Sequence, residues 1–132
     1  MGPAATAAHR EPLNREAIVA AAVAVADEEG VGALSMRHLA RRLGYEVMSL
    51  YTHVANKDEL LALMVDAVAA EIDEPPTDLT PLAAVRTTAV STHDVLVRHP
   101  WAPVLWQRHL PGPARTRLMD DLLSLFDPKR KP

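Results

Sequence analysis

Apolar residues recur at helical spacing along most of the chain, and no segment alternates apolar and polar residues for long enough to form a strand. The pattern therefore predicts an all-α fold. Residues with side chains that cap helices precede four of the helical runs: Asn14, Ser35, Asn56 and Thr80. Gly30 and Gly44 follow the first two runs, at positions where helices commonly end.

These signals divide the chain into predicted helices. A first helix runs from the Asn14 cap to Glu29, and an Asn56 cap with Glu59 three residues later opens a long helix that reaches Ile72. The proline-rich stretch after Ile72 is a linker, and Thr80 with Pro81 opens the next helix. The other predicted helices are 36–43, about 46–52, 82–98, 104–110 and 114–126.

The densest pattern is SMRHLARRLGYEVMSLYTHVANKDELL, which fits two short helices joined by a tight turn and followed by a third helix. Ala40 is small where the second helix must cross the first closely, and Gly44 allows the turn. Leu39, Leu43 and Leu50 supply the apolar contacts that fix the crossing. This spacing predicts a helix-turn-helix.

The net charge of one segment is opposite in sign to that of the whole chain. The formal net charge is −3, which argues weakly against non-specific nucleic-acid binding. Between Ser35 and Lys57, however, four basic residues stand against Glu46 as the one acidic residue. A local surplus of positive charge matters to phosphates within about 10 Å, so this segment suits a nucleic-acid backbone.

Composition excludes several classes of protein. The chain has no Cys, so disulfides and thiolate metal sites are ruled out, and a reduced cytoplasm is expected. The first residues lack the apolar run of a signal peptide, and no apolar run approaches the roughly 20 residues that span a bilayer. No phosphate-binding Gly-rich loop, HExxH helix, metal spacing or catalytic triad is visible. We therefore expect no enzymatic activity, no cofactor and no metal.

The segments LARRLG, SLYTHV and NKDELL, in this order, resemble the TetR family of bacterial transcriptional regulators. The resemblance covers Leu13 to about Ile72 and implies that 46–52 is a recognition helix in the major groove of double-stranded DNA. It implies that Val47, Met48, Ser49 and Thr52 face base edges. It also implies that Tyr51 and Lys57 contact phosphate and that Arg37 reaches DNA from the preceding helix.

The chemistry of these residues gives partial independent support. Lys57 lies at the start of a helix, where the dipole and backbone N–H groups already favour an anion. Ser49 and Thr52 can donate or accept at base edges, and Arg37 is the best candidate to bind guanine. His53 is a further candidate phosphate donor, with an exposed or structural imidazole as the alternative.

Other assignments stay open between two interpretations. Tyr51 can contact phosphate or be a core aromatic, and Met48 can pack or touch a base. Glu46 can accept from a cytosine amino group or interact with the helix N-terminus. Arg41 and Arg42 fit a solvated helix face better than specific contacts, and His38 is expected to be structural or exposed.

The predicted helices and the family resemblance together predict the domain organisation. We predict a flexible N-terminal segment at 1–12, a helix-turn-helix DNA-binding domain at 13–56, a long connecting helix at 57–72 and a shortened helical regulatory domain at 73–132. Six large side chains of that last segment could line a ligand cavity: Trp101, Trp106, His93, His99, Met119 and Phe126. The apolar ones among them are expected to lie in the core instead. Leu118, Leu122 and Leu125 lie together on the final helix and are a candidate dimer interface if they are not used internally.

The expected function is sequence-specific DNA binding by a cytoplasmic repressor that a small-molecule effector controls. The resemblance implies a homodimer, because each copy of a helix-turn-helix contacts one half-site. The alternative is a shortened, non-enzymatic interaction protein that pairs with a longer relative and changes the DNA binding of that relative.

Overall fold

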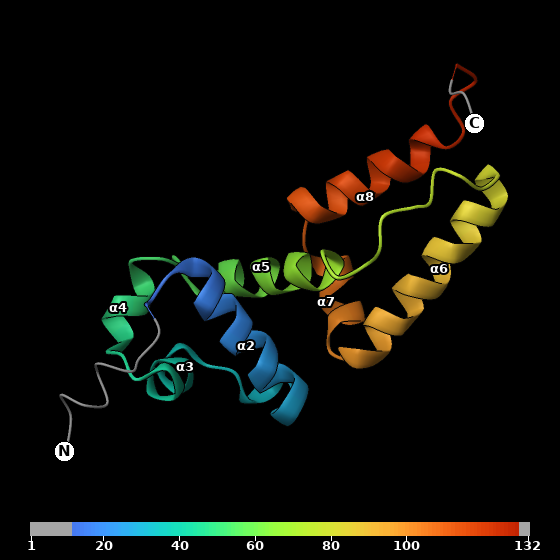
Figure 1. Ribbon diagram of the computed structural model, residues 1–132. Coiled ribbons are helices and arrows are strands. Elements are labelled where there is room, and N and C mark those ends of the chain that lie inside the picture. Colours follow the sequence, from blue (N-terminus) through green and yellow to red (C-terminus); the bar gives the residue numbers. More distant parts are fainter. Residues whose placement is uncertain (1–11, 130–132) are drawn as a thin grey trace. The chain divides into compact units, whose positions relative to one another are not determined.

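In the computed structural model of the chain, residues 12–129 are described, and every regular element among them is helical (Figure 1). The all-α prediction is therefore confirmed. The predicted flexible segment 1–12 lies outside the described residues except for Pro12. In chain order the helices are α2 (Arg15–Glu29), the 3₁₀ turn η1 (Val31–Ala33), α3 (Met36–Leu43), α4 (Val47–Tyr51), α5 (Lys57–Ala69), α6 (Pro81–Arg98), α7 (Ala102–Arg108) and α8 (Pro113–Ser124).

The chain forms two compact units that meet within α5, the first ending at Met64 and the second beginning at Val65. In the described part of the first unit, α2, η1, α3 and α4 pack with the start of α5. Its fully buried side chains come from α2, α3, α4, the start of α5 and the loops between them: Ile18, Val25, Leu34, Leu39, Leu50, Val54, Leu60 and Met64. Burial of this apolar surface stabilises the unit.

The predicted caps are present. The side chain of Asn14 accepts a hydrogen bond from the backbone N–H of Ala17 at 2.7 Å, and Gly30 ends α2 with a positive φ of 87°. Thr80 accepts from the N–H of Ala83 at 3.3 Å at the start of α6. Such caps satisfy N–H groups that have no partner within the helix, which fixes where each helix begins.

The start of α5 has the predicted pair of capping residues. Asn56 accepts from the N–H of Glu59 at 2.8 Å, and the Glu59 carboxylate accepts from the N–H of Ala55 at 3.1 Å. The two bonds hold the loop between α4 and α5 and set the position of Lys57, the first residue of α5.

The end of α5 differs from the prediction, because the helix stops at Ala69 rather than at Ile72. The backbone N–H groups of Glu71 and Ile72 bond to the carbonyls three residues earlier, at 3.0 and 3.1 Å, so the chain continues as a tighter turn. Ile72 is nevertheless buried. The apolar pattern therefore extends beyond the helix that it predicted.

The predicted bounds of two later helices were also wrong. α7 spans Ala102–Arg108 rather than 104–110, because Pro103 lies in the first turn, where no helical N–H bond is needed. α8 ends at Ser124 rather than at Phe126.

In the second unit, α5 and α8 are joined by the Asp66 carboxylate. It accepts hydrogen bonds from the backbone N–H groups of Ala114 at 3.0 Å and Arg115 at 3.1 Å, so a side chain of α5 caps α8. The guanidinium of Arg115 lies 4.6 Å from the centre of the Trp106 ring. Burial, partly opposed by the nearby Asp66 charge, lowers the pKa of Arg115.

Candidate nucleic-acid interface

The turn between α3 and α4 has the geometry that its sequence predicts. Ser35 accepts from the N–H of His38 at 3.0 Å and begins α3, and Gly44 ends it in the left-handed region, with φ 79° and ψ 30°. The N–H groups of Gly44 and Tyr45 bond back to the carbonyls of Arg41 and Ala40. This is a Schellman motif, in which glycine is favoured because its positive φ strains other residues.

Burial fixes how α3 and α4 cross. Leu39 and Leu50 are fully buried and Ala40 is 3% exposed, which agrees with the contacts that the sequence predicts for them. Leu43 is half-buried. With Leu50 directed into the core, the other side of the short helix α4 is left at the surface.

The predicted base-facing residues lie on and just after α4. Met48 is 70% exposed and Thr52 is also exposed, whereas Val47 and Ser49 are half-buried. The Thr52 hydroxyl donates to the carbonyl of Ser49 at 2.7 Å, which leaves its oxygen as an acceptor. Met48 is therefore accessible to a ligand of this surface.

The predicted phosphate contacts are also at the surface. Tyr51 is 41% exposed, so part of its side chain is accessible. Lys57 and Arg37 are exposed and His53 is half-buried. Glu46 is exposed and makes no capping hydrogen bond to α4.

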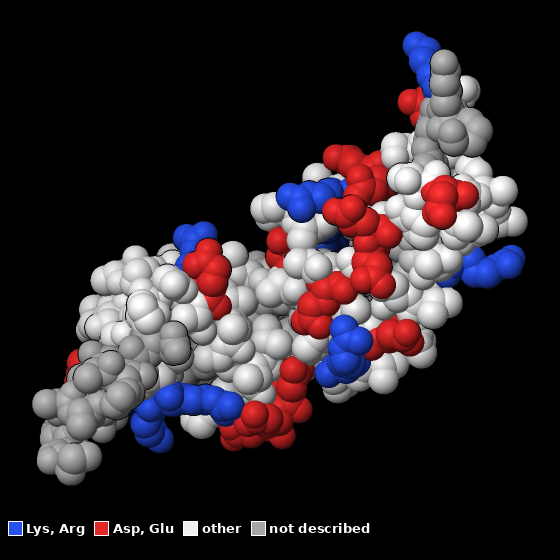
Figure 2. Space-filling model, in the orientation of Figure 1, with Lys and Arg blue, Asp and Glu red and all other residues white. Residues whose placement is uncertain are grey.

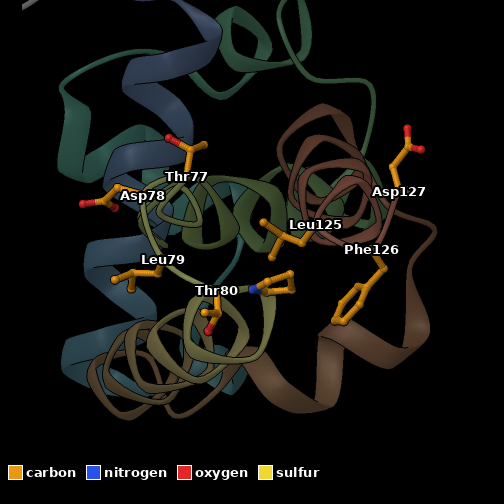
Figure 3. Close-up of a pocket in the computed structure, with 8 residues that line it drawn as sticks. Thr77, Asp78, Leu79, Thr80, Leu125, Phe126 and Asp127 are labelled. Atoms are coloured by element: carbon orange, nitrogen blue, oxygen red, sulfur yellow. The ribbon is translucent and has the colours of Figure 1, made fainter. Parts of the chain in front are cut away.

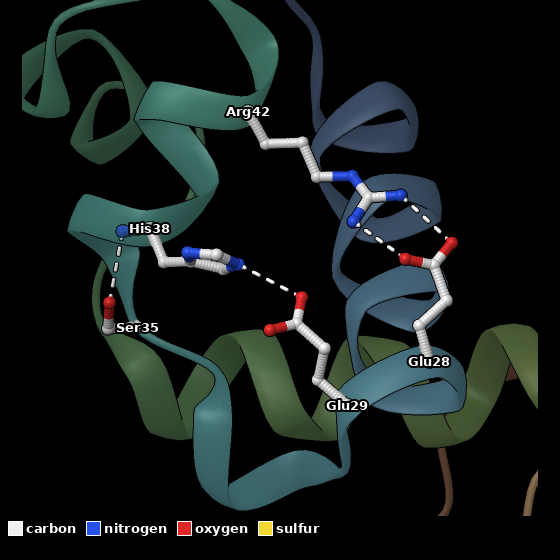
Figure 4. Close-up of polar contacts among 5 residues, drawn as sticks. All are labelled: Glu28, Glu29, Ser35, His38 and Arg42. Carbon is white, nitrogen blue, oxygen red and sulfur yellow. Dashed lines mark hydrogen bonds and ion pairs between the residues drawn. The ribbon is translucent and has the colours of Figure 1, made fainter.

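Two side chains of α3, Arg42 and His38, contact acidic residues at the end of α2. Arg42 donates two hydrogen bonds to the Glu28 carboxylate of α2, at 3.0 and 3.1 Å (Figure 4). The hydrogen bond, and then the charge, of Arg42 hold the pKa of Glu28 below its usual value. His38 lies 3.3 Å from the Glu29 carboxylate, which agrees with the structural role expected for it. Both contacts hold α3 on α2 rather than facing a ligand.

The sequence does not predict that Arg15 belongs to this surface. The Nε of Arg15, the first residue of α2, donates to the backbone carbonyl of His53 at 3.3 Å. The two residues are 38 positions apart, and no local pattern pairs them. Arg15 therefore lies at the end of α4, next to the predicted phosphate-contacting residues.

The charge of the whole chain does not favour a polyanion. On the face drawn in Figure 2, acidic side chains cover more of the surface than basic ones, in keeping with the net charge of −3. Any attraction of nucleic acid must therefore come from local positive charges, which act over about one screening length.

Comparison with known proteins identifies this helix-turn-helix. Residues 18–64 match the family described as bacterial regulatory proteins, tetR family. The helix-turn-helix segment of this chain is therefore of the TetR family. The matched segment contains α2, α3, α4 and the start of α5, which are the elements that position the candidate interface. The TetR family consists of transcription regulators rather than enzymes.

Several known proteins are similar to most of this chain. The HTH-type transcriptional repressor DrrR1 of Streptomyces coeruleorubidus is 41% identical over 120 residues, which are 88% of this chain and 44% of DrrR1. Apo ActR of Streptomyces coelicolor superposes with a TM-score of 0.80 at 33% identity, over 87% of this chain and 56% of ActR. BioQ, solved with its double-stranded DNA operator, gives a TM-score of 0.74 at 27% identity, over 86% of this chain and 70% of BioQ. The chain thus spans 44% to 70% of the length of these relatives.

The second unit of the chain contains an open, mainly apolar pocket of about 660 Å³. It lies between the linker that precedes α6 and the end of α8, and Figure 3 shows the Leu125 side chain extending toward the linker. The lining residues are Thr77, Asp78, Leu79, Thr80, Pro81, Leu125, Phe126 and Asp127.

The large side chains of this second unit divide into two groups. Trp101 and His99 are buried, and Nε2 of His99 lies 2.9 Å from the Glu71 carboxylate. Met119 and Phe126, in contrast, are 51% and 63% exposed, so their predicted place in the core was wrong. Trp106 is half-buried and His93 is exposed.

The apolar face predicted on α8 was a candidate dimer interface only if it is not used internally. Leu125 is buried, and Leu118 and Leu122 are half-buried, so this face is largely used within the chain. The exposed apolar residues of the final segment are Met119, Leu123 and Phe126.

Two kinds of site are absent from the described residues. Among residues 12–129, no helix is long and apolar enough to cross a membrane. Nor does that part of the chain hold a group of three side chains that could bind a metal ion.

Proposed function

We propose that this chain binds double-stranded DNA in a sequence-specific manner and acts as a transcriptional repressor. One observation carries the proposal: α4 buries Leu50 and exposes Met48 and Tyr51 on a helix-turn-helix of the TetR family. DrrR1 is a repressor, and BioQ was solved with a DNA operator, which supports the assignment.

The residues have distinct proposed roles. Val47, Met48, Ser49 and Thr52 contact base edges in the major groove, where apolar atoms meet thymine methyl groups and hydroxyls bind donors or acceptors. Tyr51, His53 and Lys57 contact phosphates, which supply affinity without sequence information. Arg37 binds guanine from α3.

The composition of α4 predicts modest discrimination. Its sequence, VMSLY, contains none of the Asn, Gln or Arg side chains that make paired hydrogen bonds to one base. Sequence preference should therefore come from apolar contacts and from Arg37. Association of two copies on an inverted repeat would raise both affinity and specificity.

The second unit is the proposed site of dimerisation and effector binding. Its exposed apolar residues on α6 and α8 support association with a second copy. The pocket of about 660 Å³ falls within the roughly 300 to 1,000 Å³ of small-molecule sites. ActR was also solved with actinorhodin, which supports control by a small molecule.

The first experiment selects the purified chain against a pool of genomic duplex fragments at physiological salt. Enrichment of an inverted repeat is expected for a dimeric repressor. A single enriched half-site would overturn the dimer and retain DNA binding. No enrichment would overturn the proposal and favour pairing with a longer relative, which mixing the two proteins would test directly.

Variants then test the individual roles on the enriched duplex. Tyr51→Ala and Lys57→Ala should weaken binding to all sequences, and Lys57→Ala should also lower the salt slope by about one. Arg37→Ala should relax the sequence preference. Arg117→Ala, an exposed arginine on α8, is the control and should leave binding unchanged. Unchanged affinity in the Tyr51 and Lys57 variants would contradict the phosphate assignment.

A further inference from the structure

Several charged residues of α2 lie at the end of the helix where the helix dipole disfavours their charge. Its first residue is Arg15, beside Glu16, and its last turn contains Asp27, Glu28 and Glu29 with no basic residue. A helix dipole favours acidic side chains at the start and basic side chains at the end. Contacts with other elements must therefore offset the unfavourable placement.

The structure provides such contacts at both ends. At the acidic end, Arg42 binds Glu28 and His38 binds Glu29, so α3 supplies the compensating groups (Figure 4). At the other end, the Nε of Arg15 donates to the carbonyl of His53, at 3.3 Å. That carbonyl lies just beyond α4, where carbonyl groups carry partial negative charge.

The bond to His53 uses only part of the hydrogen-bonding capacity of Arg15. A guanidinium has five N–H donors in one rigid plane, and a bond from Nε fixes that plane while the terminal nitrogens keep their four N–H groups. Arg15 is exposed. It is therefore anchored at one atom and accessible at the others.

The position of Arg15 matches the proposed path of a DNA backbone. His53 follows Thr52 directly, and Lys57 comes four residues later at the start of α5. A phosphate at the proposed contact His53 would meet the partial negative charge of the carbonyls at the end of α4. The charge of Arg15 offsets that repulsion.

We propose that Arg15 is a phosphate-binding and positioning residue of the DNA-binding surface. Its Nε holds the end of α4 through the His53 carbonyl, and its terminal nitrogens bind one backbone phosphate of the duplex. The inference rests on the proposed DNA binding and adds α2 to the elements that contact DNA.

The test is a salt titration of the full chain between about 50 and 200 mM, on the enriched duplex and on an unrelated duplex of equal length. Arg15→Gln should lower the affinity for the unrelated duplex roughly fivefold at about 150 mM, lower it further for the enriched duplex because the end of α4 is no longer held, and reduce the salt slope by about one, as expected for one lost phosphate contact. Arg117→Gln removes an equal charge from α8 and should change neither.

A second variant separates the two parts of the role. Arg15→Lys keeps the charge and loses the planar fork, so it should retain most of the salt slope. It should discriminate less well between the two duplexes, because the end of α4 is no longer held. Circular dichroism and urea unfolding of each variant establish that the first unit is folded.

Other outcomes overturn the inference in distinguishable ways. Wild-type affinity and slope in Arg15→Gln, with both lowered in Lys57→Ala, would remove the role of Arg15 and leave the proposed function standing. A lower affinity with an unchanged slope would overturn the phosphate contact. Failure of the wild-type chain to bind any duplex would overturn the proposed function as well.

Discussion

The two units of the chain differ in how completely they cover their apolar side chains. Among the described residues of the first unit, the large apolar side chains that are exposed are Met48 and Tyr51, and both belong to α4. In the described part of the second unit nine are exposed, spread from the linker through α6 and α7 to the segment after α8: Leu79, Leu82, Val90, Val97, Val104, Leu110, Met119, Leu123 and Phe126.

This contrast separates two uses of apolar surface. In the described part of the first unit, exposed large apolar side chains occur only on α4, the helix that is proposed to enter the DNA groove. The other large apolar side chains of this part are at least partly covered within the chain. In the second unit, exposed apolar residues occur on several elements, and the proposed association with a second copy would cover some of them. The difference supports DNA contact by one unit and association by the other.

The largest expected effect comes from the core of the first unit. Leu50→Ala should lower the free energy of unfolding by about 2 to 5 kcal/mol, because Leu50 is fully buried and its removal leaves a cavity. Leu123→Ala, at a position 71% exposed in the second unit, should stay within about 0.5 kcal/mol. Urea unfolding measures both. Equal losses would show that exposure does not distinguish the two units.

An intermediate effect is expected at Gly112, where the second unit depends on a close approach. A Cβ there would lie 2.7 Å from Cγ of Asp66, whose carboxylate caps α8. Gly112→Ala should therefore cost on the order of 1 to 3 kcal/mol, because the carboxylate or the helix must shift. Unfolding followed by the fluorescence of Trp101 and Trp106 measures this loss.

Gly32 in the first unit provides the matched control. A Cβ at Gly32 meets no atom within 4 Å, so Gly32→Ala should change stability by less than about 0.5 kcal/mol. If the two substitutions had the same effect, the close approach of Gly112 to Asp66 would not be important for the second unit.

The smallest effect concerns the pair that joins α2 and α3. Because Arg42 lowers the pKa of Glu28, the pair stabilises the fold above the ordinary pKa of a carboxyl group, and this contribution disappears as the pH falls through the lowered value. Arg42→Gln should return the Glu28 pKa toward its usual value in an NMR titration. Arg41→Gln, the neighbouring exposed arginine, should leave it unchanged, and a shift in both variants would point to general charge rather than this contact.

Local signals account for the parts of the fold that could be predicted from sequence. Asn14, Ser35 and Thr80 form caps with residues three positions away, and Gly44 ends α3 through its own backbone. These features depend on neighbours along the chain. They fixed the start of α2, α3 and α6 and the turn between α3 and α4.

Other features depend on residues far apart in sequence and could not be predicted. Asp66 caps α8 across 48 residues, and Arg15 reaches His53 across 38. Met119 and Phe126 were expected in the core, but the contacts that decide which face of α8 is buried come from other elements. The DNA-contacting roles came from the family resemblance and stay predictions.

The shortness of α4 affects the thermodynamics of any DNA complex. A helix of five residues is far too short to persist alone, since isolated helices below about 12 residues are marginal in water. It is ordered because Leu50 and Val54 are buried and because Arg15 and Glu59 hold the loop that follows. The conformational entropy of α4 is therefore lost when the chain folds and not when it binds DNA. Binding should therefore lack the large negative heat-capacity change that accompanies coupled folding, and its heat capacity should reflect only the surface buried against the duplex.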